Sequence, residues 1–119
     1  MKLFTSEQHK KLLANGVKNW KRRNEGKAEL DLKPVVKLFT PDGSATWLLT
    51  GILPEEPNMA FGLCDLGMGC PELGYICLAE LSEARGRLGL PVERDLYFEA
   101  DKKLSAYAKD ADQKGAIVA

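Results

Sequence analysis

Two runs of β-branched and aromatic residues, joined by a short turn sequence, constrain the fold of this chain more than any other feature. Residues 34–40 read PVVKLFT and residues 45–53 read ATWLLTGIL. Between them lies Pro-Asp-Gly-Ser at 41–44, in which the proline fixes one turn dihedral and the glycine permits a positive one. The pattern predicts a β-hairpin at the centre of an antiparallel sheet.

Shorter apolar runs predict three further strands. They cover residues 59–64, where large and small side chains alternate, residues 72–78 and residues 96–99. The residues that we expect to be mostly buried in this sheet are Leu38, Trp47, Leu49, Phe61, Leu63, Tyr75 and Ile76.

Helical signals lie on both sides of the strand-rich region. A capping box from Thr5 to Gln8 predicts a helix start, and Asn15-Gly16 predicts its end, because this dipeptide favours the left-handed conformation that terminates helices. Residues 79–85 suit one or two helical turns, and residues 104–111 carry apolar side chains at helical spacing. We expect the helices to pack on one side of the sheet.

Strands and helices do not alternate as they do in parallel βαβ folds, so the chain is expected to be a single α+β domain. Its 119 residues, of which 45% are apolar, suffice for one core. The domain over residues 1–119 divides into an N-terminal helix and basic arm (1–33), a core of about five mostly antiparallel strands with short flanking helices (34–101), and a C-terminal helical turn and tail (102–119).

The net charge is zero, but the charges are unevenly distributed. Between residues 54 and 101, ten acidic residues face only three arginines. Such a segment predicts an acidic surface that binds a basic groove on a partner protein, although a solvated face explains the same charges. The candidate binding residues are Glu55, Glu56, Glu72, Glu80 and Glu83.

The N-terminal part of the chain is basic instead. Residues 17–31 have weak periodicity and are expected to form a loop or an extended arm. Its basic residues surround one aromatic residue, as in many sites that bind single-stranded nucleic acid, yet the tryptophan could equally attach the arm to the sheet. The residues of this alternative nucleic-acid site are Lys18, Trp20, Lys21, Arg22, Arg23 and Lys27.

Catalytic and metal-binding patterns are weak. The cysteines at 64, 70 and 77 lack the paired spacing of structural zinc ligands. An enzyme would have to use Cys70, with His9 as the only histidine, or the carboxylates of Asp65 and Glu72 that flank a glycine-containing loop over residues 65–72. We therefore expect no enzymatic activity, metal or cofactor, and keep the small enzyme as a second alternative.

No segment suggests membrane insertion or export. The longest hydrophobic run, from Ala45 to Leu53, is nine residues long, which is too short to cross a bilayer. The N-terminal residues become polar before an apolar signal-peptide core can form. The expected location is the cytoplasm.

Several phrases of the sequence are specific enough to indicate a family. KLFTPD, ATWLLT, FGLCDLGMG, PELGY and LPVERD closely resemble a family of small bacterial proteins known only as a domain of unknown function. The resemblance covers nearly the whole chain and implies a context on proteobacterial plasmids and integrated mobile elements, often near antirestriction and conjugation genes. It implies no catalytic residues. The function that this context favours is binding to, and inhibition of, a host defence complex of the restriction or CRISPR type.

Overall fold

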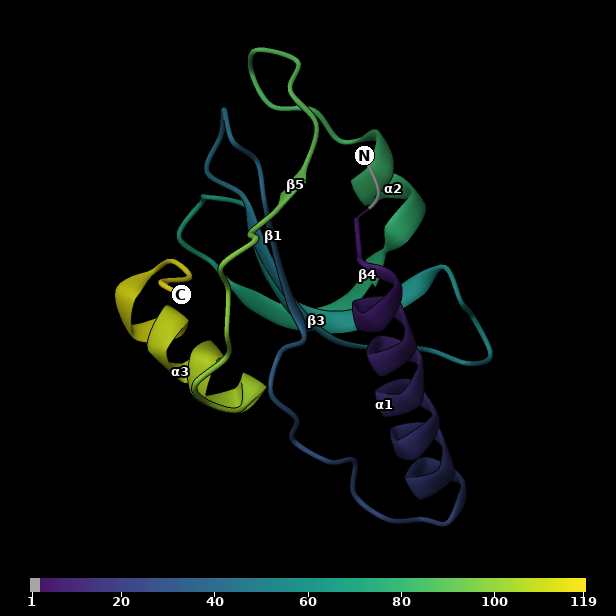
Figure 1. Ribbon diagram of the computed structural model, residues 1–119. Coiled ribbons are helices and arrows are strands. Elements are labelled where there is room, and N and C mark those ends of the chain that lie inside the picture. Colours follow the sequence, from purple (N-terminus) through teal and green to yellow (C-terminus); the bar gives the residue numbers. More distant parts are fainter. Residues whose placement is uncertain (1–2) are drawn as a thin grey trace.

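The computed structural model describes residues 3–119, which form one antiparallel sheet and three helices (Figure 1). The strand order across the sheet is β4-β3-β2-β1-β5. The predicted α+β domain with a five-stranded antiparallel sheet is confirmed. The elements are α1 (Ser6–Asn24), β1 (Val36–Phe39), β2 (Thr46–Ile52), β3 (Met59–Asp65), β4 (Glu72–Cys77), α2 (Leu78–Glu83), β5 (Glu93–Arg94) and α3 (Leu104–Lys114).

The predicted hairpin is formed by β1 and β2, with Leu38 opposite Trp47. Strand β2 lies at the middle of the sheet, and its side chains are buried on both faces. Trp47 and Leu49 join the core under α1 and α2, whereas Leu48 joins Leu63 in a second core under α3. The expectation that all helices pack on one side is therefore wrong, because both faces of β2 are apolar and each needs a cover. Figure 1 shows α3 across the sheet from α1.

Helix α1 begins as predicted but does not end at Asn15-Gly16. Thr5 Oγ1 accepts a hydrogen bond from the Gln8 backbone, and the Gln8 side chain accepts one from Thr5, which completes the capping box. The Asn15 side chain donates to the carbonyl oxygen of Thr50 at 2.9 Å, and Gly16 lies against the backbone of Ile52. These two residues allow close contact with β2 instead of ending the helix.

The helix continues past the predicted end at Asn15-Gly16 and ends at Asn24, through a Schellman motif. Gly26 has a φ of 71°, its N–H donates to the Arg23 carbonyl, and the N–H of Lys27 donates to the Arg22 carbonyl. Residues 17–24 are thus helical, and the prediction of an arm over 17–31 is wrong for them. An extended linker follows from Glu25 to the start of β1.

The fifth strand is also displaced from its predicted position. It forms at Glu93–Arg94, where these residues pair with Phe39 and Leu38 of β1. Residues 96–99 are not a strand, because the Asp95 side chain accepts a hydrogen bond from the Tyr97 N–H and turns the chain. The apolar side chains at 96 and 97 consequently face solvent.

Most of the predicted core is confirmed. Leu38, Trp47, Leu49 and Leu63 are buried, and Phe61 and Ile76 are half-buried. Tyr75 is the exception, at 53% exposed, because β4 is the outermost strand and the core under α3 ends at β3. Within residues 3–119, no helix is both long and apolar enough to pass through a membrane.

Candidate functional site

The five candidate glutamates lie at two separate places on the surface. Glu55 and Glu56 belong to the turn between β2 and β3, and Glu80 and Glu83 belong to α2. Asn58 joins these two segments, because its carbonyl and side-chain oxygens accept the backbone N–H groups of Leu78 and Ala79. These four glutamates therefore share one end of the sheet, which we call the acidic end.

Glu72 does not belong to the acidic end. It begins β4 opposite Cys64, whereas Cys77 at the other end of β4 lies opposite Met59, next to the acidic end. Glu72 and Cys77 are five positions apart along the strand, a distance of about 16 Å at the usual rise of a β-strand. The structure thus brings four of the five predicted binding residues to one end and leaves Glu72 at the other.

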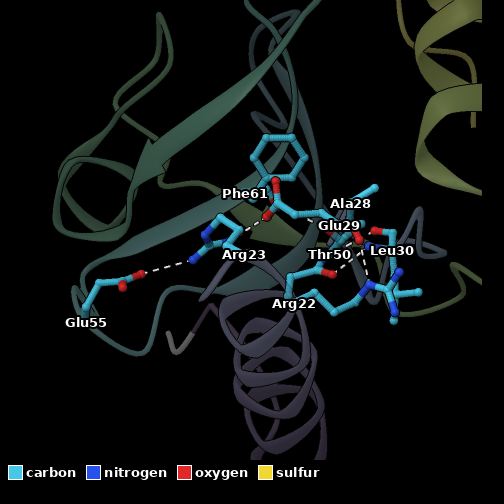
Figure 2. Close-up of polar contacts among 9 residues, drawn as sticks. Arg22, Arg23, Ala28, Glu29, Leu30, Thr50, Glu55 and Phe61 are labelled. Carbon is cyan, nitrogen blue, oxygen red and sulfur yellow. Dashed lines mark hydrogen bonds and ion pairs between the residues drawn. The ribbon is translucent and has the colours of Figure 1, made fainter. Parts of the chain in front are cut away.

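The four glutamates differ in how free their carboxylates are. Glu55 accepts a hydrogen bond from the Arg23 guanidinium at 3.1 Å, and the same guanidinium binds Glu29 in the linker (Figure 2). Partial burial alone would lower the pKa of Arg23, but the hydrogen bond and charge of Glu29, with the charge of Glu55, raise it above its ordinary value. In the part of the chain that the structure describes, Glu56, Glu80 and Glu83 are exposed and form no ion pair.

The basic residues of the alternative site lie on α1 and just after it, and several bind other parts of the chain. Arg22 donates to the Ala28 carbonyl, Arg23 binds the two glutamates, and Lys27 pairs with Glu25 at 3.2 Å. Lys18 and Lys21 are exposed, and Arg22 keeps its charge because a carbonyl is neutral, so ion pairs engage two of the five cations, Arg23 and Lys27.

Trp20 lies beside the turn that carries Glu55. It lines a shallow apolar depression with Val17, Pro54 and Glu55, and its side chain is 37% exposed. This placement favours the role of a tether between α1 and the sheet, which was one of the two roles that the sequence left open.

A small cavity of about 70 Å³ lies between α1, the linker and the end of β2. Asn15, Asn19 and Arg23 line it from α1, and Phe61 and Tyr75 line it from the sheet. The polar groups are already occupied: Asn15 binds the Thr50 carbonyl, and the Asn19 amide both accepts from and donates to the backbone of Leu30. The cavity has room for a few water molecules, and its polar side chains serve the fold.

Sequence reasoning missed this arrangement. The available signal was the spacing of Asn15, Asn19 and Arg23, which follow one another at intervals of four on one helix face. Polar residues at this spacing within an apolar face indicate a polar contact across the helix interface. The Asn-Gly dipeptide hid the signal, because it predicted that the helix had already ended.

Cys70 and His9, the thiol and imidazole of the enzymatic alternative, do not converge. Cys70 is exposed in the loop after β3, and the neighbouring Gly69 lies near Gly115 on the α3 side of the sheet. His9 belongs to α1 on the opposite face and stacks on Phe4 with ring centroids 6.1 Å apart. Across residues 3–119, no three histidine, cysteine or acidic side chains form a group that could hold a metal ion.

Cys64 and Asp65 have environments that suit the fold. Burial is the main cause that raises the pKa of the Cys64 thiol, so the reactive thiolate is disfavoured. Asp65 is only 2% exposed. One of its carboxylate oxygens accepts the Gly67 N–H at 2.8 Å, and the other accepts the Ile117 N–H at 2.9 Å. Asp65 therefore fastens the C-terminal segment to the end of β3.

Replacing Asp65 by alanine is expected to release that segment. Alanine removes both carboxylate oxygens, so the Gly67 and Ile117 N–H groups lose their acceptors, at a cost of about 1–3 kcal/mol each. Amide hydrogen exchange should show that Ile117 loses protection in Asp65→Ala and keeps it in Asp112→Ala, a control on the exposed face of α3. Unchanged protection of Ile117 in Asp65→Ala would contradict this role.

Comparison with known proteins gives one match. A family model described as "Protein of unknown function (DUF2958)" matches residues 3–118, and the chain belongs to this family. No curated protein and no solved structure matches the chain significantly.

Proposed function

We propose that this member of the DUF2958 family is a non-enzymatic accessory protein of a mobile genetic element that binds and inhibits a host defence complex of the restriction or CRISPR type. The choice of target rests on the mobile-element context that the resemblance of the sequence implies. The choice of surface rests on one structural observation, namely that Glu56, Glu80 and Glu83 are exposed at one end of the sheet and form no ion pair within residues 3–119.

Unpaired carboxylates on a folded scaffold favour a basic partner surface. Defence complexes must bind the phosphate backbone of nucleic acid, and the grooves that do so are lined by lysine and arginine. An acidic surface can occupy such a groove, because complementary potentials speed the encounter and orient the two proteins. Glu55 contributes less, because its charge is shared with Arg23.

The competing hypothesis uses the basic residues of α1. Lys18 and Lys21 are exposed and would contact nucleic acid directly. It is weakened by the ion pairs of Arg23 and Lys27 within the chain, which leave fewer unpaired charges for phosphate.

Charge reversal distinguishes the two hypotheses. The partner is recovered from host lysate with the tagged protein, and its association rate is then measured against purified variants. We expect Glu80→Lys/Glu83→Lys to slow association at least about tenfold at low salt, and DNA to compete with the protein for the partner. The control Glu99→Lys/Asp112→Lys changes net charge equally at exposed positions outside the acidic end and should bind normally.

Two results would overturn the proposal. One is normal binding by Glu80→Lys/Glu83→Lys. The other is loss of binding in Lys18→Glu/Lys21→Glu together with salt-sensitive binding of the wild-type protein to bare oligonucleotides, which would assign the function to α1.

A further inference from the structure

Among residues 3–119, no strand pairs with the outer side of β4, which leaves one edge of the sheet open. Strand β4 is the outermost strand, and its six residues Glu72–Cys77 pair with β3 without a register shift. Proteins usually protect such edges with lysine, proline or a bulge, and β4 has none of these between its ends. The opposite edge, formed by β5, has two residues and offers little to pair with.

The register shows which backbone groups of β4 face outward. The Leu78 N–H donates to the Asn58 carbonyl, next to the Met59–Cys77 pair. Since hydrogen-bonded pairs alternate in antiparallel sheets, Gly74 bonds inward to Gly62. The N–H and C=O groups of Leu73 and Tyr75 therefore point away from β3, toward the open edge.

The same two residues carry the exposed apolar side chains of β4. Leu73 is 48% exposed and Tyr75 is 53% exposed, and both lie on the face of the sheet that carries α3. Tyr75 contacts Phe61 edge to face, with ring centroids 5.4 Å apart. Gly74 between them has no atom within 4 Å of the position that a Cβ would take. The edge therefore carries apolar side chains on the face that holds α3, and on the other face, at Gly74, no neighbouring atom covers it.

We propose that β4 pairs antiparallel with β4 of a second copy of this chain, about a two-fold axis at Gly74. In this register, Leu73 lies opposite Tyr75 of the second copy, and the outward backbone groups of both residues form hydrogen bonds. Gly74 lies opposite Gly74 in a non-hydrogen-bonded pair, where the Cα atoms approach to about 4.5 Å. The two sheets become one continuous sheet.

Self-complementarity is the reason for choosing a second copy as the occupant. The two-fold axis requires each strand to match itself, and this register covers the apolar side chain of Leu73 with that of Tyr75. Glu72 lies opposite Ile76 of the second copy, so no two acidic side chains of β4 face each other across the axis. The net charge of zero leaves no overall repulsion between copies. This inference does not depend on the acidic end or on its partner.

Solution mass tests the pairing. The wild-type protein should reach twice its monomer mass of 13.1 kDa at high concentration in sedimentation equilibrium. Leu73→Lys/Tyr75→Lys places lysines opposite each other across the axis and should remain monomeric. Leu66→Lys/Met68→Lys is the matched control, because these loop residues are equally apolar and exposed; it should still dimerise.

A second variant separates loss of pairing from loss of folding. Leu73→Pro removes an outward N–H that β3 does not use, together with a side chain that is half exposed, so its circular dichroism and melting temperature should stay close to wild type while its dimer is lost. A wild-type protein that is monomeric at every concentration would overturn the proposal. So would a dimer that persists in Leu73→Lys/Tyr75→Lys, or one that the loop control abolishes.

Crosslinking tests the register. In a Cys70→Ser background, Gly74→Cys should form an intermolecular disulfide on mild oxidation, because the expected Cα separation lies within the range of disulfides. Glu72→Cys in the same background should not, since it faces Ile76 of the second copy. Crosslinking of Glu72→Cys without that of Gly74→Cys would show that the register is wrong.

Discussion

Replacing Gly16 by alanine is expected to destabilise the protein severely. An added Cβ would lie 1.7 Å from the carbonyl oxygen of Ile52 and 2.7 Å from its carbonyl carbon. Both atoms belong to the backbone of the central strand β2, which cannot move without disturbing β1 and β3. Alanine would otherwise favour the helix by about 1 kcal/mol. The free energy of unfolding of Gly16→Ala is nevertheless expected to be lower than that of the wild-type protein by about 3 kcal/mol or more.

Thermal unfolding measures this loss. The melting temperature of Gly16→Ala should fall by about 10 °C or more, since 1 kcal/mol corresponds to about 3–6 °C for a domain of this size. Gly74→Ala is the control, because a Cβ there meets no atom within 4 Å; its melting temperature should change little. If both variants melt like the wild-type protein, the close approach of α1 to β2 is wrong.

The contact at Gly16 also explains where sequence reasoning failed. Asn-Gly can end a helix, but it can also allow a helix to lie against a strand, and nothing local distinguishes the two uses. Gly51 supplies the other half of the contact, because a Cβ on Gly51 would lie 3.2 Å from the Gly16 nitrogen. The two glycines are 35 residues apart in the chain, so only the tertiary structure shows that they face each other.

Local patterns predicted the middle of the chain well, because turn chemistry and alternation act over a few residues. The hairpin of β1 and β2 and the capping box at Thr5 are examples. Burial on a given face depends on which strands lie outermost and how far each helix extends. For this reason Leu63 is buried and Tyr75 is not, although β3 and β4 have similar sequences of large and small residues.

The sequence predicted which residues could form the candidate site, but only partly where these residues lie relative to one another. Counting charges selected the acidic segment, and the folding of β4 then separated Glu72 from the other four glutamates. The count also could not show that Arg23 binds Glu55 across 32 residues of sequence. Such a pair forms only because α1 continues past Gly16 and ends beside the β2–β3 turn.

Replacing Trp47 by alanine is expected to cost about 3–5 kcal/mol, the usual range for a large aromatic residue removed from a core. Trp47 is 6% exposed and lies in the core under α1 and α2, between Leu38 on β1 and Cys64 on β3. Its loss leaves a cavity that the central strand cannot close by moving. Urea unfolding followed by circular dichroism measures the change in unfolding free energy.

The second tryptophan of the chain is the matched control. Trp20 is 37% exposed and lies beside Pro54 and Glu55 of the β2–β3 turn, so Trp20→Ala should cost about 1 kcal/mol. Because Trp47 lies in the core under α1 and α2 and Trp20 does not, we expect the loss of unfolding free energy to be several-fold larger in Trp47→Ala than in Trp20→Ala. An equal or reversed order would mean that α1 is held mainly by its C-terminal end, through Trp20 and Arg23, rather than by the core around Leu12.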